Sequence, residues 1–235
     1  MKFLLFGYKG FVGSELYSNL SSRHFHVLGV DRSSFATSLN NDDVDVVIHC
    51  ANPAKRFMAN NNPQDDLKNI RDKSKSILKS YTDKKLILIS SISCRTERNS
   101  AYGRNRREAE KEWLKHGAMV IRLGPLYGGT RVKDTLHDLI NNSHIYYSRN
   151  TLYAYANVKW SANYIVDCIC NSAFNNKIIE IGARNVISLG EIAEYVDSKS
   201  TFSNKIDTQF PLNFPVGPDA YDVLDYALAL KRGYK

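Results

Sequence analysis

The feature that most constrains the fold is a regular alternation of short apolar runs with amphipathic stretches. The apolar runs predict strands at residues 2–6, 26–30, 45–50, 85–90 and 118–123, and the stretches between them predict helices at 11–20, 63–80 and 106–116. Buried strands that alternate with helices are typical of a parallel sheet with helices on both faces. The sequence therefore predicts an α/β fold with a doubly wound parallel sheet, in which ligands bind beyond the carboxyl ends of the strands.

After residue 124 the alternation becomes irregular, which indicates a small C-terminal lobe. Helices are predicted at 132–141, 159–172, 188–196 and 219–231, and a strand at 177–182. Ser188 and Glu191 have the spacing of a capping box at the start of one of these helices. We expect residues 1–123 to form the core domain, with the strand near 177–182 returning to it. Residues 124–235 would form most of a small substrate-binding lobe.

Composition excludes several classes of protein. The 235 residues suffice for a sizeable core, and 43% hydrophobic with 24% charged residues is close to the average of soluble globular proteins. No apolar run reaches the roughly 18 residues that span a bilayer, and the apolar N-terminal run enters a glycine loop too early for a signal peptide. We therefore expect a cytoplasmic protein that has no membrane partner.

The cysteines and the net charge narrow the choice of partners. Four cysteines in a chain of this length indicate free thiols, and none has the spacing of a zinc site, so no metal is expected. The net charge is +8, but Lys and Arg are scattered along the chain and no nucleic-acid motif is present. This distribution favours an acidic small molecule, such as a nucleotide, over nucleic acid.

Three glycines follow the first predicted strand and lead directly into the first predicted helix. Gly7, Gly10 and Gly13 permit a tight turn and a close approach of the backbone to a pyrophosphate, and the helix N-terminus adds N–H donors. Strand, loop and helix in this order are typical of a Rossmann-type dinucleotide site. The loop residues predicted to contact the cofactor are Gly7, Lys9, Gly10, Phe11, Val12 and Gly13.

Asp31 ends the second predicted strand, at the usual distance from the glycine loop for a residue that contacts the adenine ribose. Its carboxylate can accept hydrogen bonds from both ribose hydroxyls, which favours NAD. Arg32 could instead pair with a 2′-phosphate, so NADP remains open. A solvated turn at these two residues is the structural alternative.

Five further segments follow the glycine loop in a characteristic order. They read DVDVVIHCAN, NNPQDDLKNI, LILISSIS, YGRNRREAE and VIRLGPLYG. With the glycine loop, this series resembles the extended short-chain dehydrogenase/reductases, specifically the NAD-dependent epimerase/dehydratase family that acts on nucleotide sugars. The resemblance covers most of the chain and is strongest over residues 1–128. It implies cofactor contacts by Cys50, Ala51 and Asn69.

The resemblance also implies three catalytic residues. Ser91 would hydrogen-bond the substrate oxygen, Tyr102 would donate or remove its proton, and Arg106 occupies the position of a lysine that holds the nicotinamide ribose and lowers the tyrosine pKa. A phenol has an ordinary pKa near ~10, so a nearby cation must favour the phenolate if the group is to act near neutral pH. Positions 102 and 106 are neighbours on one helix face. Ser93 is a second hydroxyl that could share the role of Ser91 at the substrate.

Two departures from the family pattern stand out. Arg106 keeps the charge of a lysine but has a planar, bulkier head group. Only about a dozen residues separate Asp31 from the next predicted strand, which leaves room for the loss of one strand and helix of the usual fold. A structural alternative also exists for the site: Tyr102 would be a packing residue, and Arg106 would pair with Glu110 on an exposed helix face.

The resemblance thus implies an NAD(P)-dependent epimerase, dehydratase or ketoreductase of a nucleotide sugar, in which hydride transfer accompanies proton transfer by Tyr102. Arg131, in the basic C-terminal lobe, is suited to the substrate diphosphate. The alternative is a non-catalytic NAD(P)-binding sensor or scaffold with the same fold. The sugar, the direction of reaction and the assembly, a homodimer included, stay open.

Overall fold

The computed structural model describes residues 1–39, 41, 43–171, 178–212 and 214–233. The chain divides into two compact units. Unit 1 consists of Met1–Arg122 and Ala162–Ile179, and unit 2 consists of Leu123–Ser161 and Glu180–Lys235. All four cysteines are free thiols, as predicted. Among the described residues, no helix is both long and apolar enough to cross a membrane.

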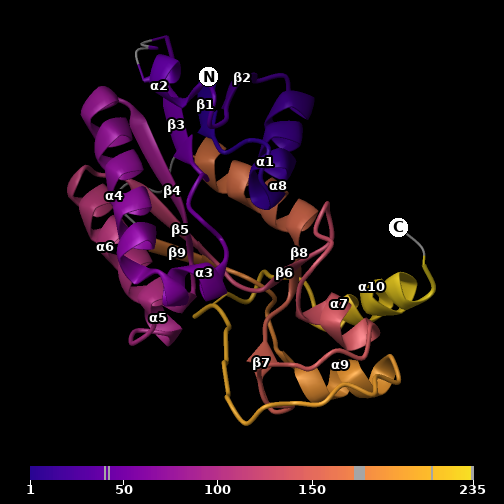
Figure 1. Cartoon of the computed structure of the whole chain (residues 1–235). Coiled ribbons are helices and arrows are strands. Elements are labelled where there is room, and N and C mark those ends of the chain that lie inside the picture. The colour runs from indigo at the N-terminus through magenta and orange to yellow at the C-terminus, as the bar shows by residue number, and fades with distance from the viewer. Residues whose placement is uncertain (40, 42, 172–177, 213, 234–235) are drawn as a thin grey trace. The chain divides into compact units, whose positions relative to one another are not determined.

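A six-stranded sheet forms the centre of the fold (Figure 1). In spatial order its strands are β2 (His26–Val30), β1 (Lys2–Phe6), β3 (Val46–His49), β4 (Lys85–Ser91), β5 (Met119–Leu123) and β9 (Ile178–Ile181). β1 pairs in parallel with both β2 and β3, and β3 pairs in parallel with β4. The chain thus runs from β1 to one side and then returns to the other, so the strand order reverses beside β1. The predicted doubly wound sheet is confirmed, and its ligand site is expected at this reversal.

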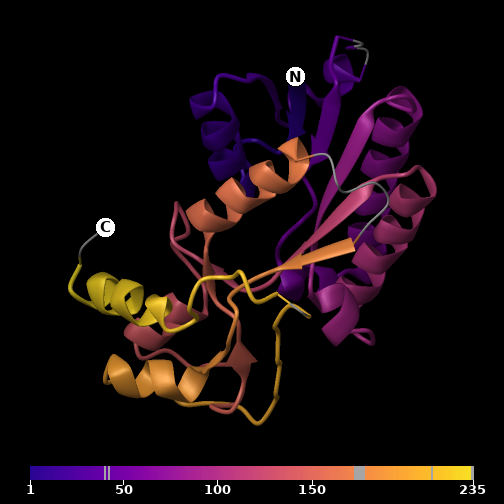
Figure 2. The same cartoon turned by 180° about the vertical axis from the view of Figure 1, so that it is seen from behind.

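Helices cover both faces of the sheet (Figures 1 and 2). α1 (Phe11–Ser22) and α8 (Val158–Cys170) lie on one face, and α4 (Pro63–Ser80) and α6 (Ala101–Lys115) lie on the other. α4 and α6 pack against a core in which Trp113 and Tyr81 are fully buried. This layer positions the first turn of α6, which carries Tyr102.

Three short helices fill the connections of unit 1. They are α2 (Phe35–Ser38), α3 (Arg56–Asn61) and α5 (Ser93–Thr96). In the described part of the connection from β2 to β3, α2 is the only regular element, in agreement with the shortened connection expected there. Sequence periodicity did not predict α3, whose residues RFMANN include the exposed Phe57 and Met58.

α6 begins at Ala101, before the predicted start at Arg106. Two side chains bind N–H groups of its first turn: Ser100 Oγ accepts from Gly103 N (3.0 Å) and Asn60 Oδ1 accepts from Tyr102 N (3.2 Å). These acceptors satisfy donors that the helix itself leaves without partners. Tyr102 therefore lies within the helix, on its first turn.

A buried ion pair joins α6 to the sheet. Arg122 of β5 donates from Nη2 to Glu110 Oε2 (2.6 Å), and Ser90 of β4 donates to Glu110 Oε1 (2.6 Å). Glu110 and its partners thus connect one helix with two strands. The alternative in which Glu110 pairs with Arg106 on an exposed helix face is wrong.

Unit 2 has a hydrophobic core of its own, which includes Leu136, Ile187 and Ile192. Its helices are α7 (Thr135–Ile140), α9 (Leu189–Tyr195) and α10 (Asp222–Lys231). Its strands are paired as β6 (Leu126–Tyr127) with β8 (Ala156–Asn157) and as β7 (Leu152–Tyr153) with β10 (Ile187–Ser188). The predicted capping box of Ser188 and Glu191 is present.

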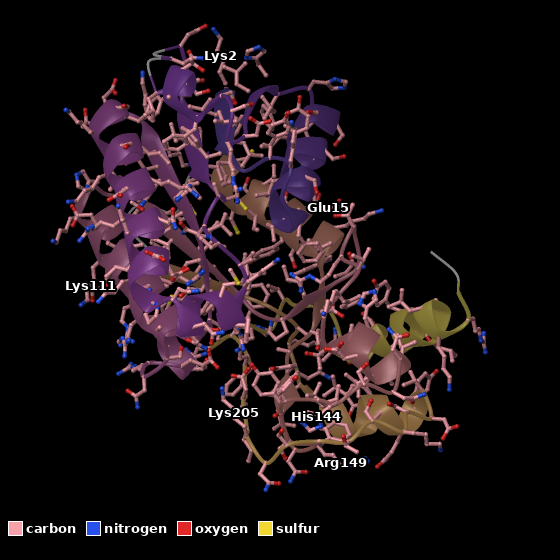
Figure 3. All side chains as sticks on the ribbon, in the orientation of Figure 1. Lys2, Glu15, Lys111, His144, Arg149 and Lys205 are labelled. Atoms are coloured by element: carbon pink, nitrogen blue, oxygen red, sulfur yellow. The ribbon has the colours of Figure 1, made fainter. Side chains whose placement is uncertain are left out.

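Basic side chains are dispersed over both units (Figure 3). In unit 1, Lys2 pairs with Asp43 and Lys111 with Glu108, and in unit 2, Arg149 pairs with Glu194. The structure thus agrees with the scattered charge seen in the sequence.

Candidate active site

The glycine loop joins β1 to α1 in a conformation that requires small residues. Gly7 has φ of 87°, which L side chains rarely adopt, and a Cβ on Gly13 would lie 2.1 Å from the Gly7 carbonyl oxygen. Gly10 is the N-cap of α1, and no side chain caps this helix end. Phe11 and Val12, both half-buried, form its first turn. The loop fits a pyrophosphate because the backbone is accessible and the helix dipole points its positive end there.

Residues 50–56, referred to below as the loop 50–56, follow β3 and end with the first residue of α3. The first residues of this loop, Cys50 and Ala51, lie against Gly7 of the glycine loop. A Cβ on Gly7 would lie 2.8 Å from the Cys50 carbonyl oxygen and 2.9 Å from Ala51 Cα. Lys73 of α4 donates to the Ala51 carbonyl (3.3 Å). Burial raises the pKa of the Cys50 thiol to about 12, so it stays protonated. Cys50 and Ala51 therefore lie beside the glycine loop.

Asp31, at the end of β2, is bound by neighbouring side chains. Lys9 of the glycine loop donates to Asp31 Oδ2 (2.5 Å), and Oδ1 accepts from the N–H groups of Ser33 (3.0 Å) and Ser34 (3.2 Å). The hydrogen bond from Lys9, and then that from the Ser33 hydroxyl, hold the pKa of Asp31 well below its usual range. Arg32 is exposed. A ribose that approaches Asp31 must therefore share this carboxylate with Lys9.

His49, the last residue of β3, is fully buried and uncharged. Its ring stacks on Trp113 with centroids 5.4 Å apart, and Nε2 donates to Asn52 Oδ1 (3.1 Å). Burial, reinforced by the charge of Lys73, lowers the pKa of His49 to about 3. The imidazole thus holds Asn52 in the loop 50–56.

The guanidinium group of Arg106 lies over the ring of Tyr102. Its guanidinium carbon is 3.4 Å from the ring centroid, and both residues are buried. Arg106 Nη1 donates to Asp66 Oδ2 (3.3 Å) and to the Tyr102 carbonyl (3.1 Å), and Nη2 donates to the Pro53 carbonyl. Asn105 also donates to Asp66 Oδ2 (2.9 Å). The cation is therefore close to the phenol ring, but these donors point to protein acceptors.

Ser91 and Ser93 form a pair of hydroxyls at the end of β4. Ser91 Oγ donates to Ser93 Oγ (3.2 Å), and the Ser93 N–H donates to Ser91 Oγ (3.2 Å). Ser93 is fully buried and also accepts from Arg56 Nη2 (3.0 Å). The guanidinium carbon of Arg56 lies 5.6 Å from the centroid of the Tyr102 ring. Arg56 therefore contacts both the serine pair and the tyrosine.

Asn69 of α4 does not join this cluster. Asn69 is exposed, and its amide donates to the Asp65 carbonyl of its own helix (2.9 Å). Arg131 belongs to unit 2, where it donates to the Leu126 carbonyl (3.4 Å).

Four polar residues of the cluster were not predicted from the sequence. They are Arg56, Asp66, Lys73 and Asn105. Asp66 lies within the quoted segment NNPQDDLKNI and Asn105 within YGRNRREAE, so their place inside these motifs was the available signal. Arg56 and Lys73 gave none, because neither lies in a recognisable pattern.

The site thus consists of a Rossmann-type sheet whose order reverses beside a glycine loop, with Ser91 at the end of β4 and Tyr102 on α6. No family model and no curated protein matches the sequence.

Solved structures share the fold along nearly their whole length. One is TunA, an NAD-dependent NDP-hexosamine 5,6-dehydratase of tunicamycin biosynthesis (TM-score 0.83, 14% identity, 100% of this chain and 98% of that one). Another is a dTDP-4-dehydrorhamnose reductase from Clostridium acetobutylicum (TM-score 0.81, 13% identity, 99% and 100%). A third is UDP-glucose 4-epimerase from Thermotoga maritima with UDP-glucose (TM-score 0.80, 13% identity, 100% and 98%). The fold predicted from the family resemblance is confirmed.

Proposed function

We propose that the protein is an NAD-dependent enzyme that acts on a nucleotide sugar as an epimerase, dehydratase or ketoreductase. In this proposal, residues 1–123 and the strand near 177–182 bind the dinucleotide. Residues 124–235 bind most of the substrate, with Arg131 at its diphosphate. Neighbours of the same fold are named as enzymes of nucleotide sugars, and one was solved with UDP-glucose and NAD.

The observation that carries the proposal is the path of the loop 50–56. Its first residues pack against Gly7, and the carbonyl of Pro53 accepts from Arg106, which lies on the Tyr102 ring. Arg56, at its end, donates to Ser93. This short segment therefore links the glycine loop with the immediate neighbours of Ser91 and Tyr102, the two hydroxyl-bearing residues assigned to acid–base chemistry.

The chemistry divides among these residues. NAD, when bound, supplies the hydride acceptor for a sugar carbon. Tyr102 takes the proton of the sugar hydroxyl or returns it, and Ser91 orients that hydroxyl through a hydrogen bond. Arg106 fixes the plane of the phenol ring and keeps a positive charge against it.

Turnover of a panel of nucleotide sugars tests the proposal. We expect NAD to raise the melting temperature and at least one UDP-, dTDP- or GDP-sugar to be converted, with the product identified by mass spectrometry or NMR. Tyr102→Phe should abolish conversion and keep NAD binding, because it removes only the hydroxyl. Gly10→Trp should block NAD binding. Conversion by Tyr102→Phe at the parental rate would overturn the assigned role.

One observation favours a non-catalytic NAD(P)-binding protein as the second candidate. The donors of Arg106 are directed to Asp66 and to two carbonyls, so this residue does not present them to a ribose as a lysine would. NAD binding without conversion of any sugar in the panel would select this candidate.

The preference for NAD over NADP rests on the carboxylate of Asp31, which repels a 2′-phosphate. Lys9 neutralises part of that charge. We therefore expect Lys9→Ala to weaken NADP binding more than NAD binding, as measured by calorimetry at one ionic strength. Glu15→Ala, which removes a charge from the half-buried Glu15 of α1 (labelled in Figure 3), serves as the control. A parent that binds NADP at least tenfold more tightly than NAD would reverse the assignment.

A further inference from the structure

The side chain of Arg56 has no role in the proposed reaction as described above, although it lies close to Tyr102 and Ser93. It is the first residue of α3 and lies in the loop region between β3 and α4. Its side chain is partly buried, pairs with Glu97 (3.7 Å) and donates from Nη2 to Ser93 Oγ (3.0 Å). Its guanidinium carbon is 5.6 Å from the centroid of the Tyr102 ring.

The backbone keeps these groups close together. A Cβ on Gly103 would lie 2.7 Å from the Ser93 carbonyl oxygen and 2.2 Å from that of Glu97. The turn that carries Ser93 therefore packs directly on the residue after Tyr102. Because Asn60 of α3 also accepts from the Tyr102 N–H, α3 and α6 are joined beside Arg56.

The hydrogen bonds of Ser91 show what Arg56 can influence. A hydroxyl has one donor and two acceptor positions. Ser91 Oγ donates to Ser93 Oγ and accepts from the Ser93 N–H, so Ser91 can donate to a substrate oxygen only by turning its proton away from Ser93. Arg56, by donating to Ser93 Oγ, fixes the group that receives the Ser91 proton.

Arg106 does not hydrogen-bond the serine pair as Arg56 does. It reaches the face of the Tyr102 ring, but its donors bind Asp66 and the carbonyls of Tyr102 and Pro53. Of the two guanidinium groups beside the ring, the one on Arg56 also contacts the serine pair.

We infer that Arg56 is a positioning residue of the proposed active site, which orients Ser91 through Ser93 and holds a positive charge beside Tyr102. The inference rests on the proposed function for its catalytic consequence. Its geometric part, the coupling of Arg56 to Tyr102, does not require that any substrate be known.

The first experiment compares Arg56→Gln and Arg56→Lys with Phe57→Ala, a change at the next residue, whose side chain is exposed. We expect Arg56→Gln to lower kcat about 100-fold with KM and NAD affinity nearly unchanged, because misplacement of reacting groups has effects of this size. Arg56→Lys should restore part of kcat, and Phe57→Ala should match the parent. Parental kcat in Arg56→Gln, or a loss confined to KM, would overturn the inference.

A second experiment needs no turnover. The ring signals of Tyr102 in a ¹H–¹³C NMR spectrum can be identified by their loss in Tyr102→Phe. We expect them to move in Arg56→Gln and to stay in place in Phe57→Ala. If the parent converts no nucleotide sugar, the proposed function fails, and the NMR result alone decides the coupling. Tyr102 signals that are unchanged in a folded Arg56→Gln protein would refute it.

Discussion

The side chain of Arg106 makes hydrogen bonds in a geometry that the compact ammonium group of a lysine would not reproduce. Its planar head group lies over the Tyr102 ring and donates to a carboxylate and two carbonyls. The spacing of four residues correctly predicted that the two side chains would meet. The partner Asp66 could not be predicted from spacing, because it is 40 residues away and only the packing of α4 on α6 brings it there.

Removal of Arg106 should therefore be costly. Arg106 and Asp66 have side chains that are 3% and 5% exposed. Arg106→Met would leave a buried carboxylate without its ion pair, and we expect a loss of about 3–5 kcal/mol in the free energy of unfolding. Adding Asp66→Asn should recover part of this loss because the uncompensated charge is gone. Urea unfolding of the four proteins measures the coupling, and strictly additive losses would contradict it.

His49 should make stability depend on pH. The pKa of His49 is about 3 in the folded protein against an ordinary value of 6.5. Between these two pH values the unfolded chain therefore binds a proton at His49 that the folded chain does not bind. Its contribution is complete above pH 6.5 and is lost as the pH falls toward 3. From pH 6.5 to 5 the free energy of unfolding should drop by roughly 2 kcal/mol on this account.

His49→Gln is the matched variant for this effect, because its amide can still donate to Asn52. Urea unfolding at both pH values should show a smaller drop in the variant than in the parent. An equal drop in the two proteins would exclude His49 as the cause.

Among the elements, α6 shows how one cap fixes the start of the helix that carries Tyr102. Ser100 Oγ accepts from Gly103 N, so Ser100→Ala should cost about 1 kcal/mol of stability. Ser76→Ala is the control: Ser76 lies inside α4, and the side-chain hydrogen bond that it makes within the described residues goes to the Asp72 carbonyl of its own helix. We expect this control to be neutral or slightly stabilising. Equal effects of the two changes in thermal unfolding would argue against the cap.

The elements also show what periodicity can predict. The core strands and long helices were predicted because each buries a continuous apolar face. The short α3 has no such face, since Phe57 and Met58 are exposed and Ala59 is buried. Its position depends on contacts with α6, such as that of Asn60, which lie outside its own sequence. The unpredicted Arg56 belongs to this same element.

For the whole molecule, the net charge of +8 should assist the approach of anionic ligands. We expect the association rate of NAD to fall as NaCl rises from 50 to 300 mM, because exposed charges are increasingly screened. Nicotinamide riboside, which lacks the pyrophosphate, is the control and should show a much weaker dependence in stopped-flow fluorescence. An NAD association rate independent of salt would show that the scattered charges do not steer it.

At this scale, the sequence predicted the order of motifs around the sheet but not the contacts between them. The glycine loop follows from a local pattern, whereas Ser91 and Tyr102 follow from the family resemblance and the order of its motifs. The loop 50–56 that connects them has no pattern of its own, and its role emerges only when Cys50 lies against Gly7 and Pro53 against Arg106.

This loop therefore serves as a spacer of fixed length. An inserted or deleted residue between Ala51 and Arg56 would misalign the loop with the glycine loop or with Arg106 and Ser93. This would happen even though no residue with a proposed catalytic role had changed. A loop from another protein that replaces residues 50–56 should therefore keep the same number of residues, and its length should matter more than its amino-acid sequence.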